Sequence, residues 1–326
     1  MATAQGPQLE SILVEAEFLT RPRPMPSAPL RERLRSSSAL RRLAPASVIV
    51  AAAQSRGRAL WRSDPATRQY AIAAMEAIVA GTARADQAEQ LARQCLVEQA
   101  VLEELFWMPW RMPSIDRASA NHAQAAFSSG RGVLISSCHL GAIGLRLWPL
   151  SAPERRIYTT AAQWYFEEPN SDYLGRRLAR WWRQIARRNE LVIPASGSFA
   201  LLAQLLERGD AVQVYFDMPG GTRTQFLGKP VMLSSGSARL ALATDALILP
   251  VTIRREGVGC RTEVCAPLDP RSHPDLEELQ HALAGVHESL ILEQPQALED
   301  PNRPGAWEGL ASAAEWANPR EARQLR

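Results

Sequence analysis

Short apolar runs separated by segments long enough to form helices fill the chain after residue 113. Runs of this length are typical of buried strands, and a helical segment between two strands provides a crossover connection. This alternation predicts an α/β fold with a mostly parallel central sheet flanked by helices. The expected strands cover residues 132–136, 156–160, 191–194, 211–216 and 247–253. The expected helices cover residues 171–188, 198–208, 235–244 and 275–293.

The first part of the chain has a different pattern and predicts an N-terminal helical region over residues 1–112. Apolar residues recur at helical spacing in two stretches, 66–79 and 85–107. The sequence Ser63-Asp64-Pro65 is typical of a helix cap followed by proline in the first turn. Residues 113–326 then form the predicted α/β core.

Composition and charge exclude several functional classes. The 326 residues contain 37 basic and 34 acidic side chains, and a net charge of +3 does not indicate a nucleic-acid partner. Four cysteines without a C-x-x-C pair support neither a disulfide framework nor a zinc site, so we expect no metal. The most apolar stretch, residues 43–53, is about half the ~20 residues of a membrane span. Without a secretory signal, the chain is expected to be cytoplasmic, with at most peripheral membrane contact.

Two polar residues follow predicted strands, where active residues gather in α/β sheets. His139 comes directly after the strand at 132–136 and could present an imidazole at the sheet edge; the alternative is a histidine satisfied in the interior. Asp217 comes directly after the strand at 211–216 and could orient or polarise a base. A glycine-rich turn and Arg223 follow and could hold an anion; the alternative is an ordinary solvated turn.

A third segment could also bind an anion. Lys229 is the only lysine in the chain and lies in the sequence Phe-Leu-Gly-Lys-Pro. Ser235, Gly236 and Ser237 open an expected helix, where small residues leave backbone amides available to an anion such as phosphate. A simple helix cap explains the same three residues.

The order of these segments resembles the lysophospholipid acyltransferase superfamily, and within it the bacterial lipid A lauroyl/myristoyl acyltransferases. The resemblance rests on three stretches: GRGVLISSCHLGA, ALLAQLLERGDAVQVYFDMPGG and FLGKPVMLSSGSARLALATDALILPVTIRR. It spans about residues 115–255 and implies an acyltransferase-like core. It implies transfer of an acyl group from a thioester of acyl carrier protein or coenzyme A to a hydroxyl or amine.

The resemblance also implies roles for the candidate residues. His139 would be the general base, assisted by Asp217, and no cofactor would be needed because the thioester is already activated. Arg223, Lys229 and the amides of Ser235, Gly236 and Ser237 would bind an anionic group of donor or acceptor. The acceptor could be a small molecule, a lipid or a carrier-bound substrate of a lipid or natural-product pathway.

The sequence departs from the family pattern at one catalytic position and at the N-terminus. The family has an acid five positions after the histidine, and Gly144 stands there. Membrane-bound members commonly carry a transmembrane anchor near the N-terminus, and we expect none in this chain. These departures leave two alternatives to an acyltransferase: a catalytically weakened protein that binds acyl chains or a carrier protein, and a thioesterase with water as the acceptor.

Overall fold

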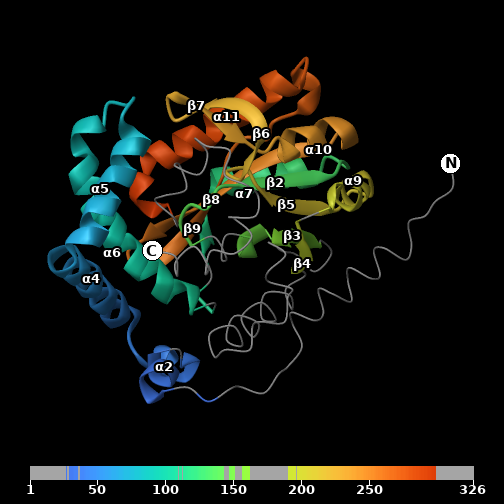
Figure 1. Ribbon diagram of the computed structural model, residues 1–326. Coiled ribbons are helices and arrows are strands. Elements are labelled where there is room, and N and C mark those ends of the chain that lie inside the picture. Colours follow the sequence, from blue (N-terminus) through green and yellow to red (C-terminus); the bar gives the residue numbers. More distant parts are fainter. Residues whose placement is uncertain are drawn as a thin grey trace.

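The structure is a computed structural model of the chain, and it describes residues 27–298 except 28, 36, 109, 112, 143–146, 151–155, 162–189 and 196. The predicted helix at 171–188 and Gly144 lie outside the described residues. Figure 1 shows a central sheet with one group of helices beside it and others against its faces.

The central sheet has seven described strands in the order β1-β9-β8-β2-β5-β3-β4. All neighbouring strands are parallel except β8 and β9, which form an antiparallel pair. The predicted mostly parallel sheet is therefore confirmed. Its strands are β1 (Ser114–Ile115), β2 (Val133–Ser137), β3 (Ile157–Ala161), β4 (Glu190–Pro194), β5 (Ala211–Tyr215), β8 (Leu247–Glu256) and β9 (Gly259–Val264).

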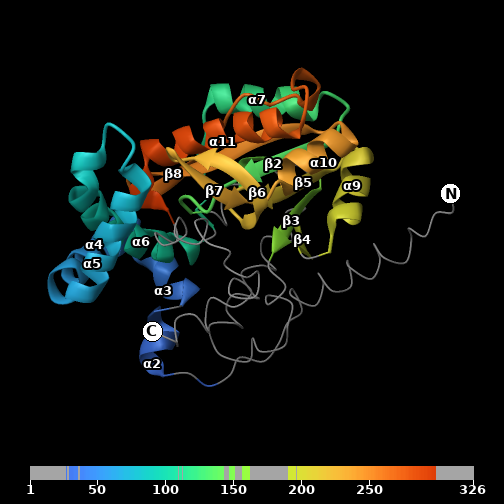
Figure 2. The same cartoon turned by 45° about the horizontal axis from the view of Figure 1, so that its top comes forward.

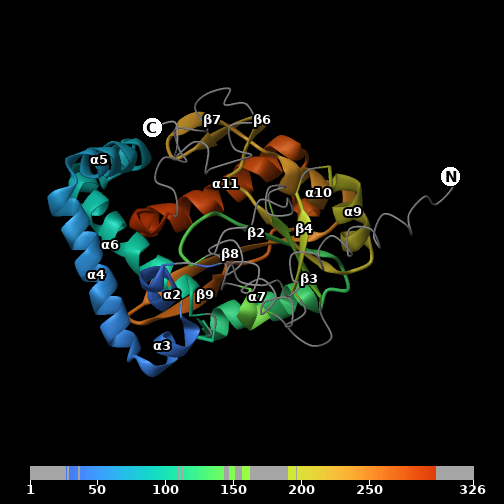
Figure 3. The same cartoon turned by 60° about the horizontal axis from the view of Figure 1, so that its bottom comes forward.

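Helices cover both faces of the sheet. Figure 3 shows α7 (Arg117–Phe127) on one side, and α9 (Phe199–Glu207), α10 (Gly236–Thr244) and α11 (Leu276–Glu293) on the other. Alternate residues of β5 contribute to two apolar clusters, because side chains along a strand point to opposite faces. Val212 and Val214 pack with α9, α10 and α11, whereas Ala211 packs with α7 residues. We call these the α11 face and the α7 face.

A two-stranded antiparallel hairpin lies outside the central sheet and corrects the predicted turn after Asp217. The glycines of that segment belong to β6 (Pro219–Phe226), which pairs with β7 (Lys229–Leu233). The register shifts between Pro219 and Thr222, so Gly220 and Gly221 lie in an irregularity of the ladder rather than in a turn. Figure 2 shows the hairpin beside α11.

The described N-terminal residues are helical, as predicted. The helices are α2 (Leu30–Arg35), α3 (Ser38–Leu43), α4 (Ala46–Ser63), α5 (Pro65–Val79) and α6 (Ala88–Phe106), with a 3-10 turn, η1 (Ala85–Gln87), before α6. Asp64 caps α5, accepting a hydrogen bond from the Thr67 amide at 3.0 Å. Apolar side chains of α6 share the core cluster of the α11 face, which joins these helices to the α/β part. None of the described helices is both long and apolar enough to cross a bilayer. The boundary at residues 112 and 113 stays a prediction.

Candidate active site

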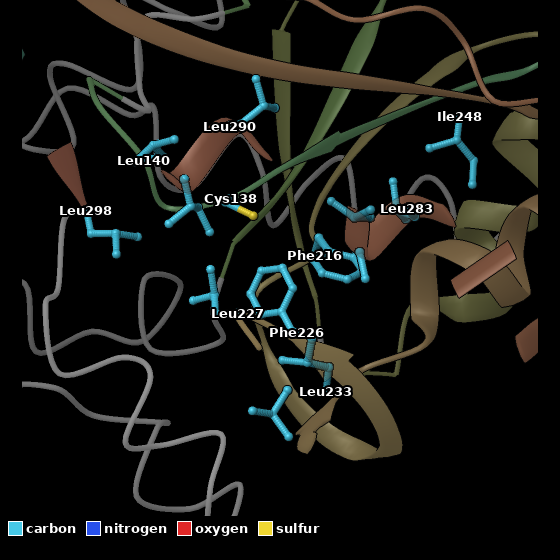
Figure 4. Packing of buried hydrophobic residues seen from close by; sticks show 14 of the residues in the cluster. Cys138, Leu140, Phe216, Phe226, Leu227, Leu233, Ile248, Leu283, Leu290 and Leu298 are labelled. Atoms are coloured by element: carbon cyan, nitrogen blue, oxygen red, sulfur yellow. The ribbon is translucent and has the colours of Figure 1, made fainter. Parts of the chain in front are cut away.

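His139 follows β2 in a short loop that the chain's last described residues hold in place. The Leu140 amide donates to the Cys138 carbonyl at 2.8 Å, and the Gly141 amide donates to the Ala297 carbonyl at 2.8 Å. Leu140 also forms an antiparallel bridge with Leu298. In Figure 4, Cys138, Leu140 and Leu298 lie in one buried apolar cluster, so the Cys138 thiol packs into the core.

Gly141 has a conformation and surroundings that only glycine satisfies. Its φ is +73°, in the left-handed region that disfavours side chains. A Cβ there would lie 2.1 Å from the Ile253 carbonyl oxygen. The glycine two positions after His139 therefore lets the histidine loop pass directly over β8.

Asp217 reaches His139 because the two residues follow neighbouring parallel strands. Ser137 and Tyr215 are paired in the β2–β5 register, and the Phe216 amide donates to the Ser137 carbonyl at 2.8 Å. The Asp217 side chain is fully buried, and its Oδ1 lies 2.8 Å from His139 Nδ1. Its Oδ2 accepts the His139 backbone amide at 3.0 Å. The two residues predicted from strand ends are thus in direct contact.

Tyr215 fixes the plane of the imidazole. The two rings stack with centroids 3.9 Å apart and planes inclined by 19°. Tyr215 lies on the α7 face, two residues after Gln213, so the imidazole is held at the edge of that face. The His139 side chain keeps 14% exposure, which leaves an approach for a reacting group.

The contacts of His139 define its tautomer. An ionised carboxylate only accepts hydrogen bonds, so in the neutral imidazole Nδ1 donates to Asp217 and Nε2 carries the lone pair. No described residue forms a hydrogen bond with Nε2. A histidine whose Nδ1 is oriented by a carboxylate and whose Nε2 is available can take a proton from a hydroxyl or amine.

A second histidine lies behind this pair on the α11 face. His287 is buried in α11, stacks on Phe216 at 4.8 Å between centroids, and its Nε2 lies 2.9 Å from Ser136 Oγ. Burial lowers the pKa of His287 to about 4, against the opposing effect of the Asp217 charge. The sequence pattern alone indicates no functional role for His287, although its spacing from the apolar residues of the expected helix at 275–293 is consistent with burial.

Ser235, Gly236 and Ser237 lie close to the segment that follows Asp217. Gly236 begins α10, and the preceding Ser234 amide donates to the Met218 carbonyl at 2.8 Å. A Cβ on Gly220 would lie 2.5 Å from Ser234 Cα, so this approach also requires glycine. The Ser235 hydroxyl accepts from Thr222 Oγ1 at 2.9 Å.

The structure does not bring Arg223 and Lys229 next to His139. Arg223 is exposed on β6, opposite Met232. Lys229 pairs with Phe226 at the far end of the hairpin, on the order of 20 Å from Pro219 at the rise of an ordinary strand. Gly228, beside Lys229, packs instead against Gly81.

No group of three or more potential metal ligands occurs among the described residues. None of the four cysteines, all of which are described, forms a disulfide. Burial raises the pKa of Cys260 to about 12 and that of Cys265 to about 11, so neither thiol favours a nucleophilic thiolate.

The structure is that of an α/β protein with a histidine–carboxylate pair at one edge of a mostly parallel sheet, and sequence comparison gives its family. The family described as bacterial lipid A biosynthesis acyltransferase matches residues 43–297. The chain therefore belongs to this family, which supports acyltransferase activity in lipid metabolism. No curated protein matches the sequence. Among solved structures, the 1-acyl-sn-glycerophosphate (LPA) acyltransferase PlsC from Thermotoga maritima is similar, with 15% identity and a TM-score of 0.37 over 62% of this chain and 80% of that chain.

Proposed function

We propose that the protein transfers an acyl group from a thioester to a hydroxyl or amine, with His139 as the general base. The contact between His139 Nδ1 and Asp217 Oδ1, 2.8 Å long and at the ends of adjacent parallel strands, carries this proposal. Membership in an acyltransferase family supports the reaction class. Asp217 supplies the carboxylate that the family pattern has at the position of Gly144.

The reaction needs no covalent enzyme intermediate. Nε2 of His139 takes the proton of the acceptor while the acceptor's oxygen or nitrogen attacks the thioester carbonyl carbon. The resulting tetrahedral intermediate collapses, the carbon–sulfur bond breaks, and the thiolate receives the proton from Nε2. Asp217 stabilises the imidazolium formed between the two steps, and the stacked Tyr215 ring fixes the orientation of the His139 ring.

The donor is proposed to be an acyl thioester of acyl carrier protein or coenzyme A. The backbone amides of Ser235, Gly236 and Ser237 lie near the segment after Asp217 and suit a phosphate of the donor or acceptor. Arg223 and Lys229, farther along the hairpin, would contact a more distant anionic group. The acceptor is a lipid, a small molecule or a carrier-bound substrate. We propose that the protein acts in the cytoplasm and contacts a membrane at most peripherally.

Mass spectrometry of the purified protein with a panel of acyl thioesters and nucleophiles tests the proposal. The wild-type protein should form an acylated acceptor, and His139→Ala should reduce the rate by ~10²–10⁴-fold without loss of folding. His281→Ala, on the exposed side of α11, is the matched control and should retain wild-type turnover. Release of free acid without transfer would identify a thioesterase. Binding without any product would identify a binding protein.

A further inference from the structure

Two buried polar side chains lie next to each other among apolar residues of the α7 face. Gln213 in β5 pairs in register with Thr159 in β3 and Ile135 in β2. Paired residues of parallel strands point to the same face, so the Gln213 amide and the Thr159 hydroxyl lie side by side. Their neighbours on this face, including Val133, Ile135, Ile157, Ala211 and Leu249, form an apolar cluster.

Within the described part of the chain, the polar atoms of this patch have no hydrogen-bond partner. Gln213 is 0% exposed, and neither its side-chain amide nitrogen nor its amide oxygen forms a hydrogen bond with a described residue. The buried Thr159 hydroxyl also has none. Buried polar groups in folded proteins are nearly always hydrogen-bonded, and each exception calls for an explanation. A ligand group that arrives during the reaction provides one.

The patch lies directly inward from the candidate active site. Gln213 precedes Tyr215 by two residues on the same face, a rise of ~6.6 Å along the strand. The Tyr215 ring stacks on His139, so the catalytic imidazole and the Gln213 amide share one face of the sheet. Tyr215 is half-buried and Gln213 is fully buried, so Gln213 lies deeper in the protein than the ring that stacks on His139.

We propose that Gln213 and Thr159 bind a hydrogen-bonding oxygen on the acyl chain of the donor, so that the enzyme selects acyl thioesters with a hydroxyl near the thioester. This inference rests on the proposed acyl transfer and names its donor class. The acyl chain is the part of the substrates that gains from entering an apolar interior, because burial of each methylene group is favourable. A chain that entered beside Tyr215 and followed the apolar cluster would reach Gln213 and Thr159 a few bonds from the carbonyl. A glutamine amide and a threonine hydroxyl can both donate to and accept from one hydroxyl.

Competition between β-hydroxyacyl and unsubstituted acyl thioesters of equal chain length tests the proposal. The wild-type enzyme should prefer the hydroxylated donor by ~10-fold or more in kcat/KM, because a site built for a hydroxyl rejects the analogue that lacks it. Gln213→Met and Thr159→Val remove the polar groups at nearly constant size. Each should reduce the preference to about 3-fold or less, mainly by slowing the hydroxylated donor.

Thr252→Val is a matched control on the opposite face of the sheet. Thr252 is also buried with an unpartnered hydroxyl, but in β8 it alternates with Val251 and Ile253 and points away from the α7 face. It should leave the preference unchanged. Equal use of both donors by the wild-type enzyme, or an unchanged preference in Gln213→Met and Thr159→Val, would overturn the inference and leave acyl transfer intact.

A binding experiment separates failure of this inference from failure of the proposed function. Unreactive acyl thioether analogues, with and without the β-hydroxyl, are titrated into the wild-type protein and the three variants. Tighter binding of the hydroxylated analogue, lost in Gln213→Met and Thr159→Val, supports the inference even if no transfer is detected. Equal binding overturns it, and a crystal structure with only water at Gln213 in the complex with the hydroxylated analogue would do the same.

Discussion

The Asp217 carboxylate holds His139 by two atoms at once, the ring nitrogen Nδ1 at 2.8 Å and the backbone amide at 3.0 Å. One contact orients the imidazole, and the other fixes the backbone that carries it. The carboxylate is fully buried, so water does not compete for these bonds. This is a more constrained arrangement than a side-chain pair alone.

The position of the acid explains how a family member can have glycine at residue 144. An acid five positions after the histidine would approach the imidazole from the histidine's own loop. Here the carboxylate comes from the neighbouring strand β5, through the register that pairs Ser137 with Tyr215. We infer that the orienting role passed from the loop to the adjacent strand end.

Asp217→Asn tests this inference. The variant keeps the size of the side chain but replaces an acceptor-only carboxylate with an amide that can also donate. The imidazole can then present the wrong tautomer, and kcat should fall by ~10³–10⁴-fold, as expected for loss of an orienting carboxylate. Single-turnover kinetics with a thioester donor measures this. A loss of less than 10-fold in a folded variant would show that another group orients His139.

Tyr215 provides a milder test of ring positioning. Tyr215→Phe keeps an aromatic face at 3.9 Å from the imidazole, and kcat should stay within ~3-fold of wild type. Tyr215→Leu removes the stack, which is worth about 0.5–1.5 kcal/mol, and should lower kcat by ~10-fold with a smaller effect on KM. Equal activity in the two variants would show that stacking does not contribute to catalysis.

Gly141→Ala should both destabilise the protein and reduce activity. The new Cβ would meet the Ile253 carbonyl at 2.1 Å in a conformation with φ of +73°. We expect a loss of about 2–4 kcal/mol in the free energy of unfolding and a displaced His139 loop. Gly209→Ala is the control, because Gly209 also has positive φ (+83°) but no atom within 4 Å of the new Cβ. Gly209→Ala should lower the free energy of unfolding by only about 1–2 kcal/mol and leave turnover intact. Equal losses of unfolding free energy in the two variants, measured by urea unfolding, would rule out the steric explanation.

The sequence predicted the sheet and the two strand-end residues because these depend on local patterns. Apolar runs bounded by helical segments identified β2, β3, β4, β5 and β8, and their parallel order follows from the crossover connections. His139 and Asp217 were found because polar residues directly after buried strands meet at one edge of a parallel sheet. Which of the candidates would touch depended on strand order, and only the structure places β2 beside β5.

The hairpin and the buried polar groups were missed for a different reason. Pro219, Gly220 and Gly221 have turn chemistry, yet pairing with β7 keeps them in a bulged strand. The hairpin turns at Leu227 and Gly228, whose φ values are +54° and +76°; leucine rarely adopts this conformation, so the sequence lacks the usual Asn-Gly or Asp-Gly signal of such a turn. The pairing places Lys229 at the end of the hairpin far from Pro219. Gln213 occupies one position in an otherwise apolar strand, and nothing in the sequence shows that its amide is left without a partner.

The last prediction concerns the acid sensitivity that His287 gives to the fold. Burial holds the pKa of His287 at about 4 in the folded protein, below the ordinary value of 6.5. The unfolded chain therefore binds the extra proton between about pH 6.5 and pH 4, and the free energy of unfolding falls as the pH falls through this window. The full loss is on the order of 3 kcal/mol, and above pH 6.5 this contribution is fully present.

His287→Gln, which can still donate to Ser136 Oγ, should lose less stability between pH 7 and pH 4.5 than the wild type, measured by urea unfolding at both pH values. His281→Gln, exposed on the same helix, should follow the wild-type pH dependence. If His287→Gln shows the same loss as His281→Gln, other groups cause the acid sensitivity.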